Sequence, residues 1–445
     1  MSRLRRWWLD LNSSLWFVPT LMTVVAIGLA YGMVLLDLYF GREWITAYPL
    51  LFGAGADGAR GMLTAIAGSM ITVAGLTFSL TLATLAQVAS QYTPRLLRNF
   101  MRDRTNQVVM GAFVSVFVYC LVVLRTIRGG DEGAFVPSLA VVVGLVLALG
   151  SIGMLIFFIH HIASSIQAAN VIARAADETA RLLEKTFPLD PEAPAPTGGP
   201  DNPAALAALR WTVVTAPVTG YLQGVDYAAL LAVATSADAA VQMACALGSF
   251  VAEDAPLATV AAYSGSNIEP ATLSAVRTCY RIGSQRTLDQ DVGFGLRQLV
   301  DIALKALSPG INDTTTAVQC IDRLGALLAL LAPRVLGVPI LGADGRARVL
   351  VESADFTAYL GTAFDQIRAS ATGNVAVYVR LLTALRTVAT RIGHHADRRP
   401  AVQQQAALTL AAAEKTLATP YEMAQVRAHY RRFEDALRPD GLVGA

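Results

Sequence analysis

The amino-acid sequence predicts a mainly α-helical integral membrane protein, with four transmembrane helices followed by a cytoplasmic α+β domain. Three observations indicate this class. The chain is 54% hydrophobic and 15% charged, with a mean hydropathy of +0.49, which is too apolar for an ordinary soluble protein. Four long apolar segments lie before residue 160. A Pro/Gly-rich stretch then precedes a region with both strand and helix patterns.

The four spans are expected at residues 15–39, 61–92, 108–124 and 136–159, because each can cross a hydrocarbon core about 30 Å thick. Arginines are most frequent in the leader and in the loop after the second span. The positive-inside rule therefore places both termini in the cytoplasm, at the bacterial inner membrane. The loop arginines are also candidates for contact with anionic lipids or for attracting anions: Arg95, Arg98, Arg102 and Arg104.

The second span is unusual because it carries no charged residue and many hydroxyl and amide side chains. At about 100° per residue, several of them lie on or beside one stripe. Two interpretations stay open. The stripe packs against neighbouring helices, or copies of this helix line a water-filled path in an oligomer. The candidate pore-lining residues are Ser69, Thr77, Thr81, Thr84, Gln87 and Gln91.

The domain organisation follows from composition. Residues 1–165 form the membrane domain, and 166–203 form a helical stem and a Pro/Gly linker. Residues 204–268 form a small β-rich, barrel-like module with a hairpin of the kind that lipoyl- and biotinyl-type barrels use. Residues 269–445 are mainly helical, with a hairpin at Asp344-Gly345 and helices at about 355–370, 374–392, 400–418 and 420–437.

A polar cluster surrounds the helix expected after Asp291. Two aspartates precede that helix, Ser308-Pro309-Gly310 ends it, and Asn312 or Asp313 can cap the next one. The cluster residues either converge on a ligand, an ion or a gating interface, or they have structural roles only. In the second case Asp289 and Asp313 are helix caps, and Arg286 pairs with a carboxylate to fix two helices. The candidates are Arg286, Asp289, Gln290, Asp291, Asn312, Asp313 and Thr316.

Several stretches resemble a bacterial membrane-protein family known only as a domain of unknown function, number 2254. They are TFSLTLATLAQVASQYTPRLLRNFMRD, TGYLQGVD, QRTLDQDVGFGLRQLVDIALKALSPGIND and TAVQCIDRL. The resemblance covers nearly the whole chain and implies an integral membrane protein with a cytoplasmic domain. It implies no established activity. In this family the Gly-Ile-Asn-Asp run is commonly followed by Pro, whereas this chain has Thr314, so entry into the next helix is expected to differ.

The remaining features exclude several function classes. The net charge of +2 gives no basic field for nucleic acid. The four cysteines form no CxxC pair, the histidines lack metal-ligand spacing, and no nucleotide-binding or hydrolase motif is present. The modification lysine of lipoyl-type barrels is missing as well. We therefore expect no metal, no cofactor and no enzymatic activity.

Two hypotheses of function follow. The first is an oligomeric, channel-like protein whose second span lines an ion path, while its cytoplasmic domain assembles the subunits and regulates opening. The second is a membrane-anchored sensor or scaffold whose cytoplasmic domain binds a ligand or partner. The expected partners are membrane lipids, further copies of the chain, and an ion or small ligand. The direction in which four side chains face separates the two hypotheses. The channel needs them to face a central axis between copies, and the scaffold needs them to face the other spans of the same chain: Thr77, Thr84, Gln87 and Gln91.

Overall fold

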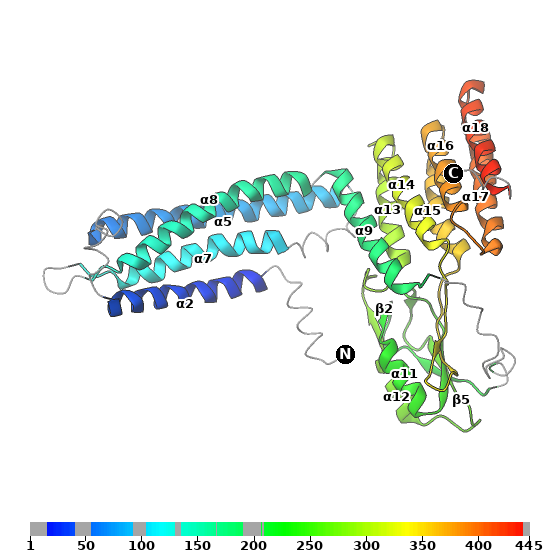
Figure 1. The fold of residues 1–445 in the computed structure, drawn as a ribbon, viewed down its shortest axis with the longest axis horizontal. Coiled ribbons are helices and arrows are strands. Elements are labelled where there is room, and N and C mark those ends of the chain that lie inside the picture. The colour runs from blue at the N-terminus through cyan, green and yellow to red at the C-terminus, as the bar shows by residue number, and fades with distance from the viewer. Residues whose placement is uncertain are drawn as a thin grey trace. The chain divides into compact units, whose positions relative to one another are not determined.

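The computed structural model describes residues 16–40, 55–91, 104–129, 135–165, 167–189, 206 and 209–438. The chain divides into two compact units, Met1–Gln167 and Ala168–Ala445. The described residues are mainly helical, with several apolar helices and a small mixed sheet region. Figure 1 shows the elements of both units.

The first unit contains four long helices that lie side by side (Figure 1). They are α2 (Phe17–Phe40), α5 (Ala56–Gln91), α7 (Arg104–Thr126) and α8 (Ser138–Ser165). Helix α7 packs against the other three and is the most buried of the four. Helix α5 has 36 residues, so it is about 54 Å long and exceeds the hydrocarbon core of a bilayer.

Five described helices are long and apolar enough to cross a membrane, where the sequence predicted four. Four of them are α2, α5, α7 and α8. The fifth is α14 (Thr314–Leu331), which lies in the second unit. Helix α14 packs against α9 (Ala168–Thr186), α13 (Val292–Ala306) and α16 (Val375–Ala389). The number of spans that the sequence predicted is therefore not confirmed by length and composition alone.

A carboxylate from α2 caps the start of α8. Asp37 accepts hydrogen bonds from the backbone N–H groups of Leu139 and Ala140, each at 3.1 Å. These N–H groups have no partner within α8 because they lie in its first turn. The hydroxyl of Tyr119, on α7, donates to the carbonyl of Ala140 at 2.8 Å. Three helices are thus joined at the start of α8.

The register of α5 against α7 follows from two contacts. Arg60, in the first turns of α5, donates to the carbonyl of Ile127, just after α7, at 3.2 Å. The two helices therefore run antiparallel. A Cβ atom built on Gly144 of α8 would lie 3.2 Å from Leu63 of α5 and 3.9 Å from Cys120 of α7. Leu63 and Cys120 consequently lie at one level of the bundle.

The second unit contains two sheets. Their strands are β1 (Thr212–Thr215), β2 (Gly220–Val225), β3 (Ala239–Met243), β4 (Phe250–Val251), β5 (Pro256–Ala262), β6 (Tyr280–Gly283), β7 (Ile340–Leu341) and β8 (Ala347–Leu350). The strand orders are β1-β5-β3-β8-β7 and β4-β2-β6. Only the β3–β8 pair is parallel among the described ladders.

The expected barrel-like module is not confirmed. In the described part of the chain, β1 pairs only with β5 and β7 only with β8, so the larger sheet stays open. Both sheets also take strands from beyond residue 268, namely β6, β7 and β8. The distant strands add to the sheets because the backbone groups of β2 and β3 need partners on both edges.

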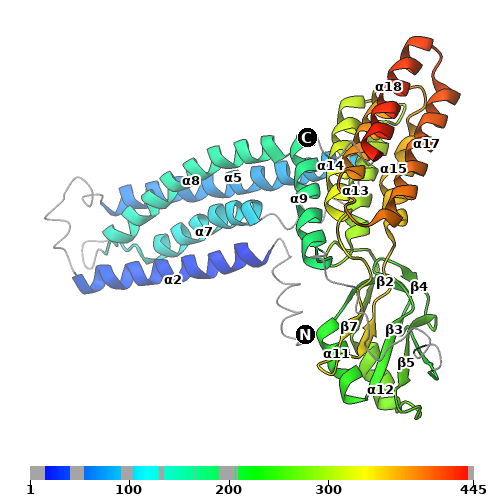
Figure 2. The same ribbon diagram turned by 45° about the vertical axis from the view of Figure 1, so that its right-hand side comes forward.

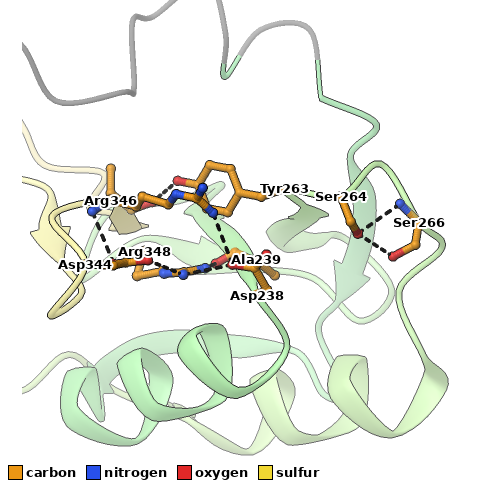
Figure 3. A network of polar contacts seen from close by, with 9 residues as sticks. Asp238, Ala239, Tyr263, Ser264, Ser266, Asp344, Arg346 and Arg348 are labelled. Atoms are coloured by element: carbon orange, nitrogen blue, oxygen red, sulfur yellow. Dashed lines mark hydrogen bonds and ion pairs between the residues drawn. The ribbon is translucent and has the colours of Figure 1, made fainter.

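The predicted hairpin at Asp344-Gly345 is confirmed and carries a polar network, drawn in Figure 3. Gly345 has φ +76°, which favours glycine at this turn. Arg348, almost fully buried, donates to Asp238 at 2.9 Å and to Asp344 at 2.6 Å. The Tyr263 hydroxyl donates to the carbonyl of Ala347 at 2.7 Å. These bonds tie the hairpin to the beginning of β3 and to the residue after β5.

The remaining helices of this unit are α11 (Tyr227–Ser236), α12 (Pro270–Thr278), α15 (Phe356–Ser370), α17 (Arg399–Thr416) and α18 (Pro420–Leu437). The helices α13 to α18 gather at one end of the unit, and the strands with α11 and α12 gather at the other (Figure 2). Helix α9, the helix expected as a stem, packs against α13 and α14 within this unit.

Two buried arginines join the end of α9 to the end of α14. Arg334 donates to the carbonyl of Phe187, just after α9, at 2.5 Å. Arg398 donates to the carbonyls of Ala332 at 2.7 Å and of Arg334 at 2.8 Å. Burial lowers the pKa of Arg398, but the free carbonyls at the end of α14 favour a cation there. The three segments are thereby fixed to one another.

Candidate functional site

The seven residues of the predicted polar cluster form two separate groups, one at each end of α13. Arg286, Asp289, Gln290 and Asp291 precede the helix, and Asn312, Asp313 and Thr316 follow it. Helix α13 has 15 residues and spans about 22 Å. The structure therefore does not bring the seven residues together around one ligand, and each group is described separately.

Asp291 is the centre of the first group. Its side chain is 5% exposed, and one oxygen accepts from Nε and Nη2 of Arg286 at 2.9 and 2.8 Å. The other oxygen accepts from the backbone N–H of Phe294 at 2.9 Å, so Asp291 caps α13. Burial raises the pKa of Asp291, and Arg286 opposes this shift. The pair is a desolvated ion pair with its hydrogen bonds made.

The backbone packs tightly over this pair at Gly248. Gly248 has φ +80°, and a Cβ atom there would lie 2.0 Å from an oxygen of Asp291. Only glycine combines this conformation with such a close approach. The guanidinium of Arg286 lies 5.4 Å from the ring centre of Phe294. The role of Gly248 could not be predicted from the sequence, because its positive φ and its distant partner are not visible in the local pattern.

Gln290 and Asp289 join the same loop to the smaller sheet. The Gln290 side-chain amide accepts from the N–H of Val225 at 2.8 Å and donates to its carbonyl at 3.1 Å. Asp289 pairs with Arg281 of β6 at 2.8 Å, at the surface. Gln223 donates to the carbonyl of Gln285 at 2.7 Å. The stretches TGYLQGVD and QRTLDQD therefore meet, and the sequence analysis had not singled out Gln223 or Arg281.

The second group caps α14. Asn312 has φ +49°, and Asp313 accepts from the backbone N–H of Thr316 at 3.0 Å and from its hydroxyl at 2.6 Å. The Thr316 hydroxyl and N–H lower the pKa of Asp313. Thr314, where the family commonly has Pro, begins the helix, and its hydroxyl accepts from Asn374 at 2.7 Å. This bond joins the start of α14 to the start of α16.

The polar stripe of α5 does not lie on one surface. Thr77 and Thr84 are 1% and 5% exposed, and they lie on the face that packs within the unit. Thr81 is half-buried, whereas Ser69 and Gln87 are exposed. The side chain of Gln91 lies outside the described residues. The Thr77 hydroxyl donates to the carbonyl of Ala74 at 2.9 Å.

The opposite face of α5 is exposed and carries only small side chains along its centre. From Gly61 onward, at about 100° per residue, eight exposed residues lie within about 40° of one direction. The exposed faces of α2 and α8 differ, because they carry large aliphatic residues such as Leu35, Leu38, Leu149 and Ile156. The eight residues, called the small face of α5, are Gly61, Ala65, Gly68, Thr72, Gly75, Ser79, Ala83 and Ala86.

Among the candidate lipid-contacting arginines, Arg104 begins α7 and is exposed. Arg95, Arg98 and Arg102 lie outside the described residues. No group of three or more His, Cys, Asp or Glu side chains that could hold a metal ion occurs within the described residues.

The apolar helix bundle and the large α+β unit are those of a membrane protein. The chain belongs to the DUF2254 family, described as a predicted membrane protein, which matches residues 12–387. This finding confirms the resemblance found in the sequence.

Its curated relatives include the uncharacterized proteins Rv1290c of Mycobacterium tuberculosis and Mb1321c of Mycobacterium bovis. Each is 34% identical over 441 residues, which cover 97% of this chain and 82% of the relative. No solved structure matches the chain.

Replacing the buried carboxylate should destabilise the second unit. In Asp291→Ala, Arg286 loses its partner in a desolvated place and α13 loses its cap, so unfolding should become easier by about 3–5 kcal/mol. Asp289→Ala is the matched control, because its pair with Arg281 is exposed and should contribute less than about 1 kcal/mol. Chemical unfolding of the full chain in detergent measures both. Equal losses would contradict the role given to Asp291.

The cap of α14 should depend on pH. Because the folded protein lowers the pKa of Asp313, its carboxylate stabilises the fold above the ordinary aspartate pKa, and this contribution disappears as the pH falls through the lowered value. Asp313→Ala should therefore cost about 0.5–2 kcal/mol near neutral pH and less in acid. Thermal unfolding of both proteins at pH 7 and pH 3 tests this. A difference that does not shrink in acid would show that the charge is unimportant.

Proposed function

We propose that this protein is a membrane-anchored scaffold or sensor whose copies associate inside the bilayer through the small face of α5. This association brings the large second units together, where they bind a ligand or partner. The observation that carries the proposal is the small face itself, which is exposed along a helix long enough to span the membrane.

The physical argument rests on what drives helices together in lipid. Lipid tails are as apolar as leucine, so spans associate mainly by close van der Waals packing. Small residues three and four positions apart let two helix backbones approach closely. The Thr72 hydroxyl donates to the carbonyl of Gly68 within α5 at 2.9 Å. It therefore needs no water and can face an apolar partner.

The proposed topology has four spans, α2, α5, α7 and α8, with both termini in the cytoplasm of a bacterium. We assign α14 to the soluble unit because it packs against α9, α13 and α16 and because its Asp322 pairs with Arg380 of α16. Arg104, together with Arg95, Arg98 and Arg102, would then lie at the inner surface, where anionic lipids attract arginines.

The burial of Thr77 and Thr84 favours the scaffold over the channel. A path lined by α5 needs these hydroxyls to face an axis between subunits, and both are covered by their own chain. The channel remains the second candidate because Ser69 and Gln87 are exposed. A path between copies would have to use those side chains and the hydroxyls of the small face.

Enlarging the small face should break the association. Gly68→Ile and Gly75→Ile place branched side chains where two backbones would approach, so the close packing that drives association is lost. Association should weaken about tenfold or more, which corresponds to about 1.4 kcal/mol. Gly150→Ile and Gly153→Ile on α8 are matched controls, because these glycines are also exposed with no heavy atom within 4 Å of an added Cβ. Cross-linking in membranes and mass measurement in mild detergent report the result.

A monomeric wild-type protein would overturn the proposed association. Dissociation of the α8 variants to the same degree would show instead that any enlarged span disturbs the protein.

Ion flux through proteoliposomes separates the two candidates. If copies of α5 line a path, the wild type should conduct, and Gln87→Leu should reduce the flux severalfold because an exposed amide is lost from the path. Thr84→Val should have little effect, because Thr84 is buried within its own chain. The scaffold predicts no flux for the wild type. Conduction blocked only by Thr84→Val would contradict both arrangements.

A further inference from the structure

Asn106 is a buried polar side chain inside the membrane unit. It lies in the first turn of α7 and is 3% exposed. Its side-chain oxygen, Oδ1, accepts no hydrogen bond within the described part of the chain. An amide oxygen without a donor is costly in an apolar bundle. The unpaired oxygen of Asn106 therefore either binds a small ligand or lowers the stability of the fold without any compensating interaction.

The register of α5 and α7 places Asn106 opposite Thr77. Leu63 and Cys120 share one level, and the helices run antiparallel. Thr77 lies fourteen residues after Leu63, and Asn106 lies fourteen residues before Cys120. Both steps are about 21 Å along the axis and return to nearly the same helix face. We infer that Thr77 and Asn106 lie at about the same level of the bundle.

The surroundings change character at this level. One heptad nearer to Leu63, the buried positions are Met70 on α5 and Phe113 on α7, both apolar. In the other direction, α5 continues with Thr81 half-buried and Thr84 buried. The buried face of α5 is thus apolar up to Ala74 and bears hydroxyls from Thr77 onward.

Both side chains offer acceptor oxygens. Thr77 uses its hydroxyl proton on the carbonyl of Ala74, so its oxygen offers only lone pairs. The Oδ1 atom of Asn106 is also an acceptor. Two such oxygens can be satisfied by a small electropositive group, which is either the hydrogens of a water molecule or a monovalent cation such as Na⁺.

We propose that Thr77 and Asn106 form a hydrated site inside the membrane unit for a water molecule or a small monovalent cation. The site lies on the face of α5 opposite to the small face, so it belongs to each subunit and does not depend on self-association. It lies near the end of the bundle where α7 begins.

Thiol labelling tests the site in the full chain. Starting from a protein whose native cysteines are replaced by alanine, Asn106→Cys is compared with Phe113→Cys, and Thr77→Cys with Met70→Cys. The two positions of each pair are seven residues apart and lie on the same face of one helix. A small, water-soluble methanethiosulfonate reacts with thiolates, which form only where water is present. Cysteines at 106 and 77 should react about tenfold faster or more than their partners.

Two helices are used so that one poorly folded variant does not decide the outcome, and a cooperative melting transition is required of each variant. Equal rates within both pairs, or no reaction at 106 and 77, would overturn the proposal.

Salt identity then separates the two ligands. Thermal unfolding of the wild type and of Asn106→Leu is compared in NaCl and in N-methylglucamine chloride at equal ionic strength. Stabilisation by Na⁺ in the wild type alone identifies a cation site. Fast labelling without a Na⁺ effect identifies bound water. Slow labelling together with no Na⁺ effect would show that neither water nor a cation binds there, and would refute the site.

Discussion

The buried carboxylate of Asp291 is the interaction on which the second unit depends. A charge with 5% exposure is tolerated only if its partners are fixed, because desolvation costs several kcal/mol per ion. Arg286 supplies the opposite charge, and Phe294 donates its backbone N–H from the first turn of α13. Gly248 has no side chain, which leaves room for the carboxylate. The adjacent Gln290 bonds to β2. One loop therefore sets where α13 begins and how the smaller sheet meets the helices.

In the membrane unit, side chains that hydrogen-bond to backbone groups at helix ends have a comparable role. Helix α7 packs against the other three spans, and bonds made by Asp37, Tyr119 and Arg60 fix one end of the bundle. The two faces of α5 have different roles. One buries hydroxyls against its own chain, and the other exposes small residues along its length. A single helix thus serves folding on one side and is free for association on the other.

Much of the local structure could be predicted from the sequence. The apolar segments, the Asp344-Gly345 hairpin and the cap that Asp313 provides for α14 all depend on residues close in sequence. The expected cap at Asp289 is wrong, because Asp291 caps α13 while Asp289 pairs with Arg281. The separation of the polar cluster could also have been deduced, since fifteen helical residues divide its halves. The parallel β3–β8 pair and the packing of Gly248 on Asp291 could not be predicted. They join segments that are distant in sequence, and the local pattern of a segment does not identify the segment that packs against it. The direction of Thr77 depends on which helix covers α5, and periodicity alone does not identify that neighbour.

The pairing of β3 with β8 also has a consequence for biosynthesis. Val241 lies opposite Val349, so β3 leaves the ribosome long before its partner is made. At about 5–20 residues per second, the delay is roughly 5–20 s. During this time the edge of β3 offers unpaired backbone groups to any passing strand. The edge of β3 is therefore a place where the nascent chain can aggregate until β8 has been made.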